Sequence, residues 1–165
     1  MKIFKILFFF TLITLIGCNT KSPRQQASGK IEGVAITVDY GAPSVKGRTV
    51  WGGLEPYDKV WRAGANENTT ISFDKNVTIN GQPLPAGKYG FFIIPKEHGD
   101  WIVIFNKKND EWGAFSYKQE EDALRVTLTP QFTTDVQEQL KYTVAENSIG
   151  FAWEKVRLNI LVKKQ

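Results

Sequence analysis

The period of the apolar residues constrains this chain more than any other feature. From Ile31 onward, apolar and polar side chains alternate at every second position in most segments, as in Val34 to Tyr40 and Leu124 to Leu128. A period of two is typical of β-strands, whereas an amphipathic helix repeats every 3.6 residues. About nine such segments follow one another, separated by turns rich in Gly, Pro and Asn. The pattern predicts an all-β fold.

Many short strands without crossover helices predict an antiparallel β-sandwich or a partly closed barrel. At most one short helix is expected, near Ser116 to Asp122, where helix formers occur without an apolar stripe. The segments Phe91 to Ile94 and Trp101 to Phe105 are apolar at nearly every position, so we expect central strands covered on both faces. The predicted core contains Phe92, Ile94, Trp101, Val103, Phe105, Val126, Leu128, Phe151, Trp153, Leu158 and Ile160.

The region between Tyr40 and Thr70 departs from this alternation. No long strand fits there, and a loop of such length in a compact domain is usually functional or disordered. Its apolar content is too large to leave in water, because it contains Val50, Trp51, Leu54, Tyr57, Val60 and Trp61. We therefore predict an ordered excursion that folds back on the sandwich.

The first 17 residues have the pattern of an export signal. Lys2 and Lys5 precede an apolar run, Ile6 to Ile16, that is shorter than the about 20 residues of a spanning helix. The following Leu15 to Cys18 resembles the bacterial lipobox, which implies cleavage before Cys18 and a lipid on its sulfur; a plain signal peptide is the alternative. The expected organisation is a signal over 1–17, a lipidated flexible tether over 18–30, and one β-sandwich domain over 31–165.

The residues after Cys18 bear on the expected location. Asn19 follows the cysteine, and no acidic residue occurs from there to Arg24. An Asp after the cysteine would favour the inner membrane in enteric bacteria, and acidic residues there are usual in surface-exported lipoproteins of Bacteroidota. Their absence favours the periplasmic face of the outer membrane, with the lipid on Cys18 joining the protein to the membrane.

Composition excludes several classes of function. Removal of Lys2 and Lys5 with the signal leaves 19 basic and 17 acidic residues, a net charge of +2 that gives no reason to expect a nucleic-acid partner. The single Cys excludes an internal disulfide, and the single His, His98, excludes a multi-histidine metal site. No phosphate-binding glycine motif or nucleophile elbow occurs, so no cofactor or metal is expected.

Five stretches form a characteristic set of motifs: Asp39 to Arg48, Trp51 to Leu54 with Pro56 and Tyr57, Val60 to Glu67, Leu84 to Tyr89, and Phe105-Asn106 followed by Trp112-Gly113. Together they resemble the bacterial family catalogued as domain of unknown function 2911, and the resemblance covers about Ser22 to the C-terminus. It implies a family that is common in Bacteroidota and often lipid-anchored. It implies no activity, substrate or catalytic residue.

The excursion also carries the candidate ligand-binding residues. Guanidinium groups bind carboxylate or phosphate, aromatic faces stack on sugars or hold cations, and Asn and Glu add directional hydrogen bonds. The alternative is structural. In that case the two tryptophans plug one end of the sandwich, Arg62 pairs with Glu67 or Asp39, and Asn66 holds a turn. The seven candidates are Arg48, Trp51, Tyr57, Trp61, Arg62, Asn66 and Glu67.

These residues favour a binding or accessory module for a polar envelope ligand, such as a glycan, or for an envelope protein. An enzyme is the less favoured class, and no catalytic residue is assigned. Its most plausible form is a hydrolase with a carboxylate pair such as Asp39 and Glu67, which needs the two groups about 5–9.5 Å apart. A purely structural envelope subunit is a third alternative.

The lipobox generates the first testable prediction. Substitution Cys18→Ser removes the sulfur that would carry the lipid, so the exported protein is expected to be soluble or unprocessed, because two or three acyl chains make a stable anchor. Membrane fractionation measures this. Unchanged membrane association of the variant after signal removal would contradict the assignment.

Overall fold

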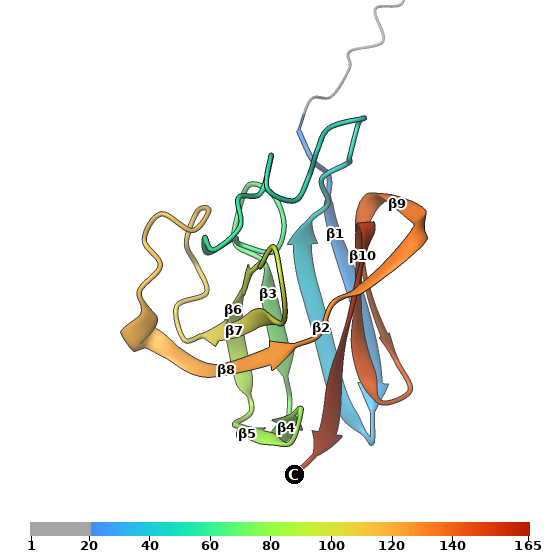
Figure 1. The fold of residues 1–165 in the computed structure, drawn as a ribbon. Helices are drawn as coiled ribbons and strands as arrows, with labels where there is room; N and C mark the ends of the chain where they lie inside the picture. The colour runs from blue at the N-terminus through green and yellow to red at the C-terminus, as the bar shows by residue number, and fades with distance from the viewer. Residues whose placement is uncertain (1–20) are drawn as a thin grey trace, which may run out of the picture.

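The fold is a two-layer β-sandwich, seen in a computed structural model that describes residues 21–165 (Figure 1). One sheet has the strand order β1-β2-β3-β6-β7-β8 and the other β5-β4-β10-β9, with antiparallel pairing throughout. The prediction of an antiparallel sandwich is confirmed, with ten strands and, over residues 21–165, no closed barrel. The strands are β1 (Arg24–Ile31), β2 (Val34–Gly41), β3 (Thr70–Phe73), β4 (Val77–Ile79), β5 (Gln82–Leu84), β6 (Gly87–Ile94), β7 (Trp101–Asn106), β8 (Asp122–Leu128), β9 (Gln131–Ala145) and β10 (Ser148–Lys164).

The first strand corrects the predicted tether. Strand β1 pairs with β2 along its whole length, from Arg24 opposite Gly41 to Ile31 opposite Val34, so the prediction of a flexible tether is wrong over residues 24–30. Its sequence gives little apolar signal because most of its residues remain exposed or half-buried at the sheet edge. Backbone pairing holds it instead. Cys18 and the signal lie outside the described residues.

Within residues 21–165, helical structure is limited to one 3-10 turn, η1 (Gln119–Glu121), which leads into β8. The turn lies inside the segment where the sequence predicted at most a short helix, and that prediction is confirmed. In the part of the chain that the structure describes, no helix has the length and apolarity needed to cross a membrane.

The predicted core is confirmed, since all eleven residues are buried with exposures of 0–8%. Most of them fill the space between the two sheets. Phe92 and Ile94 instead form a smaller cluster with Ile104, and Val60, Ala114 and Tyr117 pack against it. Strands β6 and β7 are therefore covered on both faces, as their continuous apolar runs predicted.

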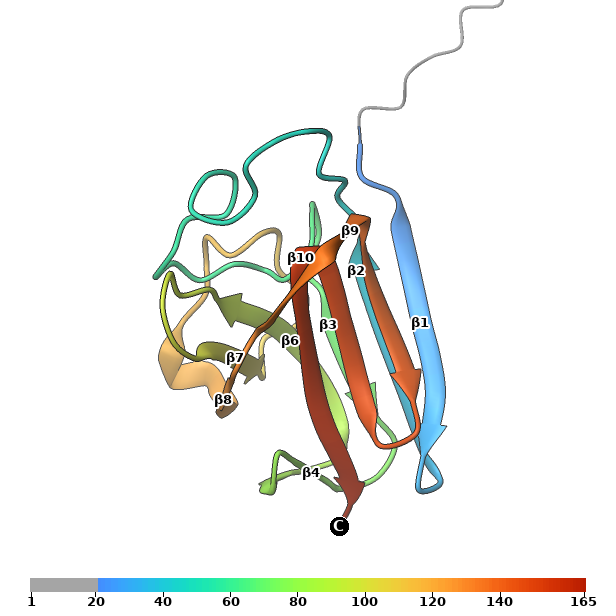
Figure 2. The same cartoon turned by 45° about the vertical axis from the view of Figure 1, so that its right-hand side comes forward.

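Two long connections shape the rest of the molecule. The excursion between β2 and β3 lies at the end of the sandwich opposite the C-terminus, and the loop 107–118 lies beside β6 and β7 (Figures 1 and 2). In the second sheet, β9 and β10 are 15 and 17 residues long, and their pairing shifts register on either side of Glu154. Such bulges bend a strand and redirect its side chains.

The core generates a stability prediction. Phe105 is fully buried, and its ring contacts the rings of Phe73, Tyr89 and Phe91 at centroid distances of 5.3–6.4 Å. Substitution Phe105→Ala is expected to lower the free energy of unfolding by about 3–5 kcal/mol, through lost burial and the cavity left behind. Urea unfolding measures this, with Phe115→Ala as the control because that ring is 90% exposed. Equal losses in the two variants would contradict the core assignment.

Candidate functional site

A cluster of four tryptophans attaches the excursion to the sandwich. The ring of Trp51 makes edge-on contacts with Trp61, Trp101 and Trp153 at centroid distances of 5.6, 4.6 and 5.6 Å. Trp61 stacks on Trp153 at 5.4 Å and is 3% exposed, and its indole N–H donates to the carbonyl of Gly64 at 3.1 Å. The structural alternative therefore holds for Trp61, whereas Trp51 stays half-buried and reaches the surface.

The two ends of the excursion are joined by backbone contacts. The N–H of Ala65 donates to the carbonyl of Gly41 at 3.1 Å, and a Cβ on Gly41 would lie 2.0 Å from the carbonyl oxygen of Ala65, so only glycine fits. Ala63, at a φ of 50°, accepts hydrogen bonds from Thr69 at 3.2 Å and from the hydroxyl of Tyr142 at 2.8 Å. Burial raises the pKa of Tyr142 well above its usual value, which keeps this hydroxyl protonated as a donor.

Arg48 is an exposed residue of the excursion whose guanidinium is held by backbone carbonyls. Its guanidinium donates through Nε to the carbonyl of Val45 at 3.0 Å and through a terminal nitrogen to the carbonyl of Ser44 at 2.5 Å. These bonds fix the orientation of the charged group before any ligand is present, which lowers the entropy cost of binding.

Two hollows meet at Arg48, and we call the pair the Arg48 site. The larger, of about 370 Å³, is lined by Arg48, Trp51 and Tyr57 together with Thr49 and Glu154. The smaller, of about 270 Å³, has three cationic side chains and no acidic one among its lining residues, which include Lys21, Ser44, Lys46, Arg48 and Gln139. The site thus combines a cationic side with an aromatic side that carries one carboxylate.

Glu154 reaches the Arg48 site through the bulge in β10. Its φ of 51° is rare for a residue other than glycine, and the register of β10 against β9 shifts on both sides of it. The sequence gives no signal for this placement, because Glu154 has the pattern of an ordinary solvent-facing residue in a strand with alternating apolar and polar positions.

Glu55 is a second carboxyl that sequence reasoning missed. It lies in the tight loop after Trp51, where its N–H donates to the carbonyl of Val50 at 2.9 Å and its own carbonyl accepts from Gly52 at 3.0 Å. Burial raises the pKa of the Glu55 carboxyl from its usual 4.5 to about 7, while the positive charges of Arg62 and Arg48 limit the rise. A carboxyl that titrates near neutral pH can donate or accept a proton.

The remaining candidates do not converge on this site. Among residues 21–165, Arg62 makes no ion pair, and its buried Nε has no hydrogen-bond partner. Asn66 has a φ of 64°, and its amide N–H donates to the carbonyl of Ser22 at 3.2 Å, which joins the excursion to the segment before β1. Glu67 is exposed and lines a separate hollow.

Asp39, one of the two carboxylates considered for a hydrolase, is already ion-paired within the protein. Asp39 forms an ion pair with Arg24, and the same guanidinium donates to the carbonyl of Asn68 at 2.9 Å. Arg24 is therefore the residue that neutralises Asp39, in place of Arg62. Asp39 serves to join β1, β2 and the end of the excursion.

A family model described as "Protein of unknown function (DUF2911)" matches residues 22–162. The chain belongs to this family. The match begins just before β1 and ends within β10, so membership of DUF2911 extends over both sheets and the excursion. No curated protein and no solved structure matches the chain.

Glu55 generates a prediction about pH. The folded state holds the Glu55 proton up to about pH 7 and the unfolded state only to about 4.5. The folded protein thus binds more protons across this window, and stability attributable to Glu55 falls as pH rises through it. Substitution Glu55→Gln removes the charge and is expected to stabilise the protein at pH 8, on the order of 2 kcal/mol, with little effect at pH 4.5.

Melting curves at the two pH values measure the effect. The exposed Glu97→Gln is the control and is expected to change the melting temperature little at either pH. A Glu55→Gln effect of the same size at pH 4.5 and pH 8 would contradict the assignment.

Proposed function

We propose that this chain is a lipid-anchored envelope protein that binds a polar, anionic ligand at the Arg48 site. The observation that carries the proposal is the position of Arg48, which lines both hollows while Ser44 and Val45 fix its guanidinium. An oriented guanidinium beside open space is suited to bidentate binding of carboxylate or phosphate.

The neighbouring side chains narrow the class of ligand. Lys21 and Lys46 add positive charge in the smaller hollow, which favours an anionic group there. In the larger hollow, Trp51 and Tyr57 offer aromatic faces, and Glu154 offers an acceptor for hydroxyl groups. This combination suits an acidic saccharide, with its anionic group toward the lysines and its ring against the aromatic residues.

The location proposed for this activity is the periplasmic face of the outer membrane. Support comes from the export signal, from the lipobox that ends at Cys18, and from the absence of acidic residues just after it. Lys21, three positions after Cys18, already lines the Arg48 site. A ligand carried by the envelope would therefore be within reach of the anchored domain.

A hydrolase remains a second candidate because of Glu55. Its pKa of about 7 would let the carboxyl act as a proton donor at neutral pH, next to the loop that presents Trp51. This candidate predicts that an acidic oligosaccharide is cleaved by the protein and left intact by Glu55→Gln. Binding of the oligosaccharide without cleavage favours the binding module.

The test of the binding module is calorimetric titration with glucuronic acid, with glucose as the neutral counterpart. Glucuronic acid is expected to bind, and Arg48→Ala to weaken its binding about 10- to 100-fold, as expected for loss of a charge-assisted hydrogen bond. Arg48→Lys keeps the charge but loses the planar fork, so only part of the affinity should remain.

Lys59→Ala is the control, because Lys59 is an exposed cation of the excursion outside both hollows. Equal affinity for glucose and glucuronic acid, or full affinity in Arg48→Ala, would contradict the proposed site. Mass spectrometry of small molecules that copurify with the lipidated protein from its own envelope would then identify the physiological ligand.

A further inference from the structure

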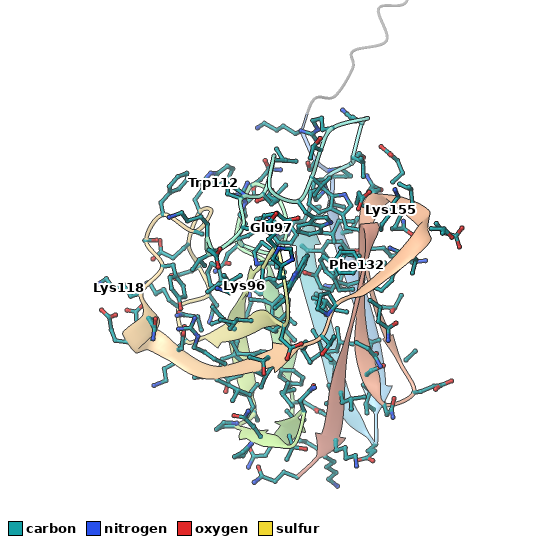
Figure 3. All side chains as sticks on the ribbon, in the orientation of Figure 1. Lys96, Glu97, Trp112, Lys118, Phe132 and Lys155 are labelled. Carbon is teal, nitrogen blue, oxygen red and sulfur yellow. The ribbon has the colours of Figure 1, made fainter. Side chains whose placement is uncertain are left out.

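A separate hollow of about 220 Å³ lies where the end of the excursion meets the loop 107–118. Five parts of the chain line it: β1, the last residues of the excursion, the start of β3, β6 and the loop 107–118. Trp112, labelled in Figure 3, belongs to that loop. We call this the Asn68 hollow. The lining residues that matter here are Arg24, Glu67, Asn68, Lys88, Asn109 and Trp112.

The walls of the Asn68 hollow are fixed by backbone hydrogen bonds. The N–H of Asn68 donates to the carbonyl of Glu111 at 3.1 Å, and the N–H of Gly113 donates to the carbonyl of Asn66 at 3.2 Å. Arg24 donates to the carbonyl of Asn68, so its guanidinium supports the wall. The loop that carries Trp112 is thereby paired with the excursion.

The side chain of Asn68 is the unusual feature of this hollow. Asn68 is 3% exposed, yet both its amide oxygen and its amide nitrogen lack a hydrogen-bond partner within residues 21–165. An unpaired buried polar group costs about 1–3 kcal/mol, so a ligand that pairs with this amide would recover that cost. The amide lies close to Gly90 of β6, and its side chain has to turn toward the hollow to meet a ligand. A carboxamide offers one acceptor beside one donor, which matches the donor and acceptor of another amide.

Trp112 supplies the apolar part of the site. It is 58% exposed, whereas the four other tryptophans of the described chain belong to the buried cluster or reach the surface only partly. Its backbone forms a β-bridge with Glu67, which fixes the position of the backbone that carries the indole. A fixed, exposed indole beside polar groups is suited to stacking on the C–H face of a sugar ring.

The rim of the hollow adds free polar groups. In the described part of the chain, the ammonium of Lys88 and the carboxylate of Glu67 make no hydrogen bond or ion pair, although both residues line the hollow. Asn109 donates its amide N–H to the carbonyl of Lys88 at 2.9 Å, which leaves its amide oxygen as an acceptor. Such groups provide directional partners for several hydroxyls.

We propose that the Asn68 hollow is a second ligand site, distinct from the Arg48 site, and that it binds one pyranose ring carrying an acetamido group. The ring stacks on Trp112, and the hydroxyls bind Glu67, Lys88 and Asn109. The acetamido group pairs with the amide of Asn68 once that side chain has turned toward the hollow. The hollow is smaller than the about 300–1,000 Å³ of sites for drug-sized ligands, which limits the bound unit to about one ring.

The test is calorimetric titration of the protein with N,N′-diacetylchitobiose, called chitobiose below, and with cellobiose. The two disaccharides share a backbone and linkage and differ in bearing an acetamido or a hydroxyl group next to the anomeric carbon. Chitobiose is expected to bind at least about tenfold more tightly. Trp112→Ala should abolish this binding, whereas Phe115→Ala should retain it, because Phe115 is an exposed aromatic of the same loop that lies outside the hollow.

Two further variants complete the test. Arg48→Ala should bind chitobiose normally, so failure of the Arg48 proposal and failure of this one are distinguishable. Asn68→Ala should lose the preference for chitobiose while its melting temperature stays the same or rises, since the amide it removes has no partner. Equal affinity for the two sugars, chitobiose binding unchanged in Trp112→Ala, or a lower melting temperature of Asn68→Ala with chitobiose binding intact would each overturn the proposal.

Discussion

Contact among four tryptophans holds the loop face of this protein in place. Trp51 comes from a long segment without regular strands, and its ring is inserted against Trp61, Trp101 and Trp153, two of which belong to strands of opposite sheets. Aromatic burial of this extent stabilises both the segment and the end of the sandwich. Arg48 and Glu55 lie three and four residues from Trp51, so their positions depend on this single insertion.

Several unfavourable local features lie in this same segment. Ala63 has a left-handed backbone, the Glu55 carboxyl is desolvated, and the Nε of Arg62 and the amide of Asn68 are buried without partners. The space between the sheets, by contrast, is filled mainly by apolar side chains. The core therefore provides the stability that tolerates these features, which is the usual relation between a rigid scaffold and a binding surface.

The sequence predicted the sandwich and its core because the period of two and the continuous apolar runs of β6 and β7 are local signals of burial. It missed β1, whose mostly polar residues pair at a sheet edge and carry no such signal. Site geometry depends on tertiary contacts. Arg48, Trp51 and Tyr57 do share a hollow, but Glu154 joins them only through a bulge, and Asp39 is paired with Arg24, a residue 15 positions earlier in the chain.

The early start of β1 limits how far the domain can move. Strand β1 starts at Arg24, six positions after Cys18. Even a fully extended chain of six residues spans only about 20 Å. With a lipid on Cys18, as proposed, the domain would stay within a thin layer above the bilayer, with the excursion end close to the lipid and the C-terminus directed away (Figure 1). Its ligands would then be molecules that belong to that layer or are brought to it, and distant material would be out of reach.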